Sequence, residues 1–178
     1  MMLDNFKEDL VVARHNMLGN VLYVLCWVFT VVFALYTLLM LQVVMFAFSA
    51  GAVLTTVFSA AGAVAMFLAK DHFKVEFEYT FTNGSLDFAK VIAGAKRKEL
   101  GSMTVANVAA CGHVAHESFR KFLAMKDVKK KNWFLNRDGN LFYFYYVKEN
   151  QKNMIIIEPS EEMVDMIRRY LPAGVYRG

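Results

Sequence analysis

The longest apolar run of the chain extends from Asn16 to Ala69 and contains no Asp, Glu, Lys or Arg. A helix rises ~1.5 Å per residue, so roughly 20 residues cross a hydrocarbon core about 30 Å thick. The run is too long for one span and has the length of two spans joined by a turn. We therefore predict a transmembrane helical hairpin over residues 16–70, with its spans at about 17–40 and 49–69.

The charges that flank this hairpin predict its orientation. Lys7 and Arg14 precede the first span, Lys70 and Lys74 follow the second, and the turn between the spans has no basic residue. Because basic residues are retained on the cytoplasmic side, we expect a multi-pass protein of the inner (cell) membrane with both termini cytoplasmic. Residues 1–15 are then a cytoplasmic N-terminal arm.

Two further observations limit the function of the hairpin and its compartment. No charged residue lies within either span, which argues against an ion pathway or a proton relay. The two cysteines, Cys26 and Cys111, fall in the membrane run and in the polar part of the chain. A disulfide between them is not expected, in keeping with a reducing compartment.

The part of the chain after the hairpin, residues 71–178, has the pattern of a soluble domain. From residue 73 to residue 82 apolar and polar positions alternate, which predicts a strand with one buried face. Asn83 and Gly84 follow, a favoured pair for a two-residue turn, and the pattern of a second strand comes directly after them. We predict a β-hairpin here.

The remainder of this domain mixes strand and helix patterns. We predict a strand that starts at the basic residues 96–98, a short helix within 113–125, a charged loop at 126–131, strands at 132–136, 141–148 and 154–157, and a C-terminal helix that Ser160 caps. Residues 141–147 are apolar on both faces, so this strand should lie centrally or under a covering helix. The predicted class is α+β: a small antiparallel sheet or partly open barrel, capped by the C-terminal helix.

This order of elements, together with three motifs, resembles a known family. The motifs are EFEYTFTNGSLD (76–87), KRKEL (96–100) and IEPSEE (157–162). The chain resembles a branch of small bacterial two-span membrane proteins with a pleckstrin-homology-like (PH-like) cytoplasmic domain. The resemblance covers nearly the whole chain and implies a curled antiparallel sheet under the last helix and a non-enzymatic binding or scaffolding role. It supplies no functional residue, and the helical insert within 113–125 departs from the pattern.

One cluster contains residue types that bind metals or act as nucleophiles. Cys111, His113, His116 and Glu117 lie close together, and the two histidines would share a helix face. Compact metal sites usually draw ligands from two separated segments, and the sequence has no recognisable second pair. Cys111 has a nearby histidine but no residue to orient it as a base. We therefore predict no cofactor and no catalytic residue, with a metal- or thiol-dependent enzyme as the most remote alternative.

Two basic segments are candidates for contact with an anionic membrane surface. They comprise Lys96, Arg97, Lys98, Lys126, Lys129, Lys130 and Lys131. Each basic residue held near an anionic leaflet contributes about 1 kcal/mol, and Trp133 beside the lysines would add interfacial insertion. The alternative is that both segments are solvated loops and Trp133 belongs to the core. Nucleic acid is not an expected partner, because the net charge of +4 is modest.

The sequence thus predicts a membrane-anchored interaction or scaffolding module without catalytic activity, which acts through its cytoplasmic PH-like domain. The expected partners are membrane lipids, a protein that the sequence does not identify, and a second copy of the chain through self-association. The alternative function is a sensor of anionic lipid headgroups that uses the basic segments. A clustered positive surface would favour the sensor, whereas an unpaired sheet edge or an exposed apolar groove would favour the interaction module.

Overall fold

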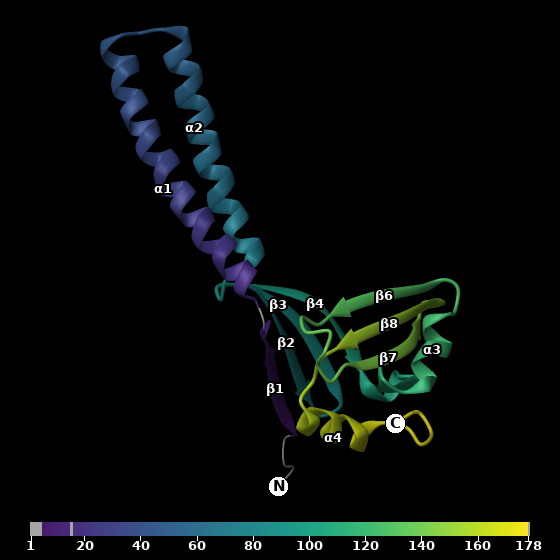
Figure 1. Ribbon diagram of the computed structural model, residues 1–178. Coiled ribbons are helices and arrows are strands. Elements are labelled where there is room, and N and C mark those ends of the chain that lie inside the picture. Colours follow the sequence, from purple (N-terminus) through teal and green to yellow (C-terminus); the bar gives the residue numbers. More distant parts are fainter. Residues whose placement is uncertain (1–4, 15, 178) are drawn as a thin grey trace. The chain divides into compact units, whose positions relative to one another are not determined.

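The computed structural model describes residues 5–14 and 16–177, and within it the chain forms two compact units (Figure 1). One unit contains the two long apolar helices and comprises residues 15–75 and 92–95. The other contains the β-sheets and comprises residues 1–14, 76–91 and 96–178. Residues 1–4 and 15 of the predicted N-terminal arm lie outside the described residues.

The helical unit confirms the predicted pair of apolar helices. They are α1 (Met17–Phe46) and α2 (Ala50–Ala69), followed by a short 3-10 turn, η1 (Lys70–Phe73). Both helices are long and apolar enough to cross a membrane, and most of their large side chains are exposed, which suits a lipid environment. The first helix continues past the predicted end at residue 40 because nothing in the apolar stretch that follows breaks a helix. Ser49 starts the second helix by accepting a hydrogen bond from Ala52 N at 3.2 Å.

Small and hydroxyl side chains hold the two helices together. Thr37 Oγ1 donates to Ser59 Oγ at 2.8 Å, and Ser59 is almost fully buried. A Cβ on Gly62 would lie 3.4 Å from the Phe33 ring, so the glycine lets this ring pack on the helix. At the base of the hairpin, Lys70 pairs with Asp71 at 2.7 Å.

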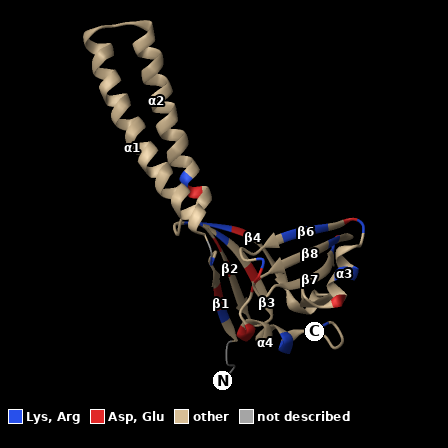
Figure 2. Ribbon diagram, in the orientation of Figure 1, with Lys and Arg blue, Asp and Glu red and all other residues tan. Residues whose placement is uncertain are grey.

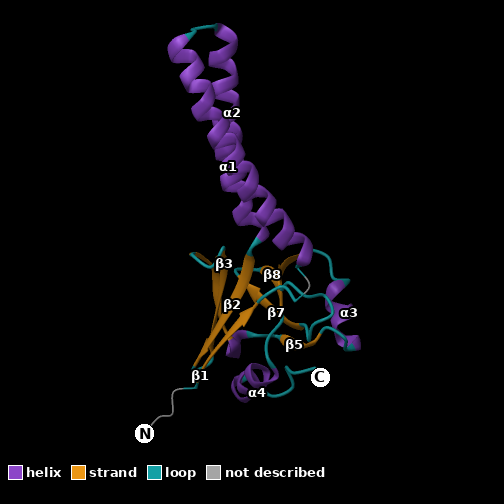
Figure 3. Cartoon of the chain, turned by 60° about the vertical axis from the view of Figure 1, so that its left-hand side comes forward, coloured by secondary structure: helices purple, strands orange, loops and turns teal. Residues whose placement is uncertain are grey.

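The first sheet has the strand order β1-β2-β3-β4. Figure 3 shows β1, β2 and β3 of this sheet side by side. Its strands are β1 (Phe6–Val11), β2 (Val75–Thr82), β3 (Ser85–Ile92) and β4 (Lys96–Thr104). The predicted β2–β3 hairpin is confirmed, and both turn residues have positive φ, Asn83 at 47° and Gly84 at 89°.

The strand β1 was not predicted. Residues 1–15 were assigned to an arm separate from the domain, yet Phe6–Val11 pairs antiparallel with β2, from Phe6 opposite Thr82 to Val11 opposite Phe77. The separate-arm assignment is therefore wrong for these residues. The reason is that β1 finds its partner across the whole membrane hairpin, and only Val11 is buried, so local pattern carries little signal.

The second sheet has the order β5-β7-β8-β6. Its strands are β5 (Ala110–His113), β6 (Val128–Trp133), β7 (Phe142–Lys148) and β8 (Gln151–Ile157). One pair departs from the predicted antiparallel arrangement, because β6 runs parallel to β8. The predicted charged loop at 126–131 is also wrong for Val128–Lys131, which belong to β6. A lysine-rich edge strand has the composition of a loop, and only its pairing with β8 distinguishes the two.

The core lies between the two sheets and under the last helix. It contains Phe77, Tyr79 and Phe81 from β2, Phe142 and Phe144 from β7, and Met163, Val164 and Ile167 from α4 (Glu161–Tyr170). The opposite face of β7 is buried too, since Tyr143 packs with Phe119 of the short helix α3 (Glu117–Leu123). These contacts confirm the central strand with two apolar faces, the short helix within 113–125, and the capping C-terminal helix, with Ser160 Oγ accepting from Met163 N at 3.2 Å.

Candidate functional site

The outer edge of β1 is the most distinctive surface of the sheet unit. Asn83 N donates to Asn5 O at 3.1 Å, so the backbone of Asn5 faces β2. Backbone groups of an antiparallel strand alternate in direction, and those of Phe6, Glu8 and Leu10 therefore point away from β2. No other strand pairs with this side of β1 within the described part of the chain.

The side chains of β1 divide into two sets with different surroundings. Phe6 and Leu10 are exposed at 57% and 55%, with Glu8 exposed between them on the same face. On the opposite face, Asp9 accepts hydrogen bonds from Ser160 N at 2.7 Å and from Ser160 Oγ at 3.0 Å. The inner set thus fixes β1 to the start of α4, and the outer set is left for contact.

Lys7 belongs to the inner set and strengthens this attachment. Its ammonium group forms an ion pair with Glu162 in the first turn of α4. The hydrogen bond to the Glu162 carboxylate raises the pKa of Lys7 above its ordinary value, partly opposed by desolvation. Lys7 and Asp9 together hold the middle of β1 against the start of α4, so the strand presents its outer edge in a fixed register.

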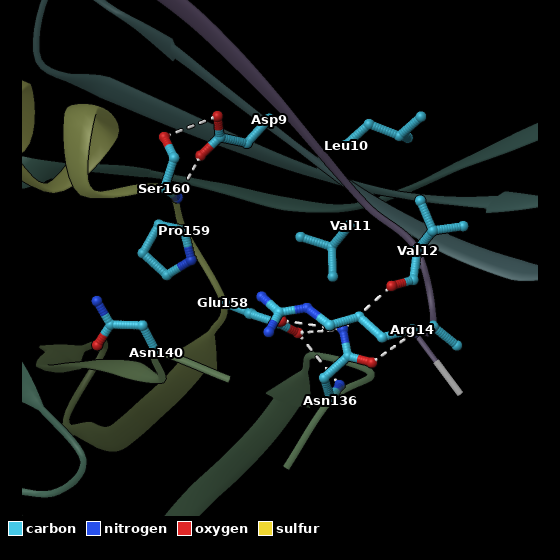
Figure 4. A pocket seen from close by; sticks show the side chains of 11 residues that line it. Asp9, Leu10, Val11, Val12, Arg14, Asn136, Asn140, Glu158, Pro159 and Ser160 are labelled. Atoms are coloured by element: carbon cyan, nitrogen blue, oxygen red, sulfur yellow. Dashed lines mark hydrogen bonds and ion pairs between the residues drawn. The ribbon is translucent and has the colours of Figure 1, made fainter. Parts of the chain in front are cut away.

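A groove of about 500 Å³ runs along the second half of this edge (Figure 4). One wall is formed by residues 9–14, and the other by Asn136, Asn140 and residues 158–160. The groove therefore lies between an edge strand and the segment that joins β8 to α4. An extended chain entering it would meet backbone hydrogen-bonding groups on one side.

A buried carboxylate, Glu158, supports the wall of the groove. Glu158 is 7% exposed, and its oxygens accept hydrogen bonds from Asn136 N at 3.1 Å and Asn136 Nδ2 at 2.9 Å. The Arg14 guanidinium lies 3.5 Å from Glu158 Oε1. A Cβ on Gly139 would come within 2.5 Å of the same oxygen, so this position requires glycine. Because its oxygens already have partners, the carboxylate is a structural anchor of the wall.

The Asn136 side chain also completes the hydrogen bonds of β1 at the end of the groove. Asn136 Oδ1 accepts from Arg14 N at 2.8 Å, and Asn136 Nδ2 donates to Val12 O at 3.1 Å. This is what a neighbouring strand would supply at that place. The chain thus satisfies its own edge beyond Val12 and leaves the part from Phe6 to Leu10 open.

Comparison with known protein families assigns the chain to one family. The family model described as a bacterial PH-like domain (DUF6106) matches residues 3–177. The chain belongs to this family. No curated protein and no solved structure gives a significant match. The match confirms the PH-like resemblance and the α+β class, and it supports a non-catalytic module in general terms.

The basic segments of the PH-like domain lie on two sheet edges (Figure 2). Lys96, Arg97 and Lys98 begin β4, Lys129–Lys131 lie in β6, and Lys126 precedes β6. The two edge strands approach each other at Gly101 of β4, whose Cβ position is 3.9 Å from the Trp133 side chain.

Several of these basic groups have partners within the domain. Arg97 forms an ion pair with Glu78, and Lys130 Nζ donates to Leu123 O at 3.1 Å. Trp133 packs on Phe88 with a ring separation of 4.8 Å, so it belongs to the core of the PH-like domain. Lysines on edge strands also discourage pairing with other sheets.

The cysteine and the two histidines of the candidate metal cluster have different structural roles. Cys111 is fully buried in β5, and burial raises the pKa of its thiol to about 12, so it is protonated at neutral pH. His113 Nδ1 bonds to Asn140 Oδ1 at 2.8 Å, and His116 caps α3 by accepting from Ser118 N at 3.2 Å. Among the described residues, no group of three or more His, Cys, Asp or Glu side chains has the arrangement of a metal site.

Sequence reasoning missed the edge of β1 and the network behind it. The alternation of residues 6–11 was present but mixes charged and apolar residues on both faces. Glu158 could have been singled out in the sequence as a carboxylate that directly follows an apolar run and precedes a proline. Nothing in the sequence pairs it with Asn136, which the pattern places at the end of a strand over 132–136, whereas β6 ends at Trp133 and Asn136 lies in the loop that follows.

Proposed function

We propose that this PH-like protein is a membrane-anchored interaction module that binds an extended segment of a protein along the open edge of β1. The observation that carries the proposal is the outward direction of the backbone groups of Phe6, Glu8 and Leu10. Addition of a strand to an open edge supplies main-chain hydrogen bonds for affinity, while flanking side chains supply specificity. Exposed Phe6 and Leu10 offer the apolar contacts beside that edge.

The other sheet edges are less suited to this role. The β5 edge carries the chain's own C-terminal residues, because Cys111 N donates to Val175 O at 3.1 Å and Arg177 N donates to Cys111 O at 2.7 Å. The edges β4 and β6 carry the lysines of residues 96–98 and 129–131. Of the sheet edges in the described residues, β1 therefore combines open backbone groups with exposed apolar side chains.

The pairing of β1 with β2 also supports the proposed topology. β1 precedes the helical hairpin and β2 follows it, yet the two strands share one sheet. The segments on both sides of the hairpin must then lie on the same side of any membrane that the hairpin enters. The basic flanks favour the cytoplasmic face of the inner membrane for that side.

Replacing Glu8 with proline tests the strand-addition proposal. The Glu8 N–H points away from β2, so proline removes a donor for the partner and leaves the β1–β2 ladder intact. We expect a photo-crosslinker at position 10 of the full chain in native membranes to form protein adducts. Glu8→Pro should reduce those adducts about tenfold, the effect of losing ~1.4 kcal/mol of binding free energy.

The matched control places the same crosslinker at Val147, an apolar residue of similar exposure at the end of β7. Adducts from position 147 should be few and should not respond to Glu8→Pro. Equal adduct formation at positions 10 and 147, or adducts at position 10 that survive Glu8→Pro, would refute strand addition at β1.

A specific observation favours a second candidate function, contact of residues 96–98 with anionic lipid. In the helical unit, Ala93 N donates to Lys74 O at 2.7 Å, and the unit includes residues 92–95. Lys96 is the next residue along the chain, so Lys96, Arg97 and Lys98 are covalently close to the base of the membrane hairpin. No comparable link supports Lys126 or Lys129–Lys131.

This second function predicts that anionic lipid protects the amines of Lys96 and Lys98 from chemical labelling. In nanodiscs of anionic lipid, we expect Lys96 and Lys98 to react with an amine-specific reagent several times more slowly than in zwitterionic nanodiscs. Lys129, exposed on β6, is the internal control and should react at similar rates in both. The full chain is needed, because a fragment of residues 71–178 lacks β1. Equal labelling of Lys96 and Lys98 in both lipids would count against a lipid contact.

A further inference from the structure

The open edge of β1 is nearly complementary to itself. We propose that a second copy of this chain docks there, with β1 of the two copies paired antiparallel about a two-fold axis through Glu8. The inference rests on the proposed function and names the partner for the same edge. It follows from the register of β1, the exposure of its outer face and the order of its charges.

The backbone requirement is met by residues that alternate along the strand. In the proposed register, Phe6 of one copy faces Leu10 of the other, and Glu8 faces Glu8. All three residues turn their N–H and C=O groups outward. Each facing pair can therefore exchange two backbone hydrogen bonds, as hydrogen-bonded pairs of an antiparallel ladder do.

The side chains match in the same register. On the outer face, the exposed side chains of Phe6 and Leu10 come opposite each other on both sides of the axis. On the inner face, Lys7 comes opposite Asp9 of the second copy, so opposite charges meet there. A shift by two residues would place Asp9 opposite Asp9 and would remove both Lys7–Asp9 pairs, so the opposite charges favour the register centred on Glu8.

The symmetry of this pairing limits the assembly to two copies. An interface that uses the same patch on both partners closes on itself and leaves no further open β1 edge. Two four-stranded sheets would then form one continuous sheet across the axis. Tethering of both copies in one membrane raises their effective concentration, so a short interface can suffice.

The axis places two like charges together, Glu8 against Glu8, and this gives a decisive test. Glu8 is exposed, so its substitution should not disturb the fold. Full-length wild type and Glu8→Lys carrying different tags are co-expressed, solubilised and analysed by native mass spectrometry. Each homodimer has a like-charge pair and the heterodimer an opposite-charge pair. At equal expression we therefore expect the ratio of heterodimers to homodimers to exceed its random value about fivefold.

A cysteine crosslink tests the same axis by distance. Facing residues of a hydrogen-bonded pair have Cα atoms about 5.5 Å apart, within the range that a disulfide spans. We expect Glu8→Cys to form a disulfide-linked dimer on mild oxidation. Thr80→Cys is the matched control, because Thr80 faces Glu8 from the adjacent strand and lies one strand further from the axis. The native Cys26 and Cys111 are buried, so wild type sets a low background.

The outcomes separate this inference from the proposed function. A random mixture of dimers, or equal crosslinking through positions 8 and 80, would overturn the two-fold pairing. If Glu8→Pro nevertheless removes adducts at position 10 in that case, strand addition stands and the partner is a different protein. If Glu8→Pro leaves those adducts unchanged, the proposed function itself fails.

Discussion

Replacing Asn136 with alanine is expected to lower the free energy of unfolding of the sheet unit by about 3 kcal/mol. The Asn136 side chain donates to Val12 O and to Glu158, and it accepts from Arg14 N. Alanine removes these bonds and leaves Glu158, 7% exposed, with a buried carboxylate that has lost a donor. Hydrogen bonds to buried charges are the ones whose loss costs most, because the desolvation of the charge is then no longer fully compensated.

The measurement is denaturant unfolding of the full chain in detergent, followed by circular dichroism of the β-sheets. Asn140→Ala is the matched control, because Asn140 is exposed in the same loop and its side chain bonds to the half-buried His113 rather than to a buried charge. We expect Asn140→Ala to change stability by less than about 1 kcal/mol. Similar losses for both variants would show that the Glu158 network does not anchor the groove.

Asn136→Asp gives this prediction a pH signature. The new carboxylate would stand about 3 Å from the oxygens of Glu158, where two negative charges repel strongly. We expect this variant to be less stable than Asn136→Ala at neutral pH and to regain stability as the pH falls, because one proton shared by the pair relieves the repulsion. Asn136→Ala should recover less, because it places no second carboxylate beside Glu158.

The second large effect is a loss of stability at alkaline pH. Burial raises the pKa of Cys111 from an ordinary value of 9.0 to about 12, and it also raises the pKa of Tyr79. Both groups stay neutral in the folded state while the unfolded chain ionises first. The contribution of the buried thiol to stability is therefore fully present below pH 9. It falls as the pH rises above 9 and is lost progressively up to the pKa of the folded state. Cys111 alone contributes about 4 kcal/mol to this fall.

The check is the free energy of unfolding measured from pH 7 to pH 11 in wild type and Cys111→Ser. Serine is close to cysteine in size and does not titrate in this range, so the variant should lose much of the slope above pH 9 even if its stability at pH 7 is lower. Tyr79→Phe should remove the part that begins near pH 10. A wild-type stability that is flat above pH 9 would contradict the burial of the thiol.

Some elements could be predicted because neighbouring residues decide them. The turn at Asn83 and Gly84 needs two consecutive residues that accept positive φ. Asparagine and glycine are such residues, so the turn could be predicted from this pair alone. Ser160 caps α4 through a hydrogen bond that reaches only three residues along the chain. The unbroken apolar run of the strand at residues 142–148 predicted two buried faces. Phe144 and Tyr143 pack in clusters on opposite sides of this strand.

Other elements could not be predicted because their partners are distant. Lys129–Lys131 have the composition of a loop, and the parallel pairing with β8 makes them a strand. Asn136 and Glu158 form the buried network only because the loop after β6 and the end of β8 meet. Glu158 belongs to the IEPSEE motif, but nothing in the sequence connects that motif with Asn136.

The sequence by itself determined the apolar helical pair, the position of the sheet-rich part and the helix that closes it, because hydrophobic periodicity and capping act over a few residues. The tertiary structure alone decided that residues 6–11 are a strand, that its backbone turns outward at Phe6, Glu8 and Leu10, and that Asn136 closes the edge beyond Val12. Strand pairing joins residues from opposite ends of the membrane hairpin, and the direction of a backbone group is set by its partner strand. A candidate site built from such an edge has no signature in residue types.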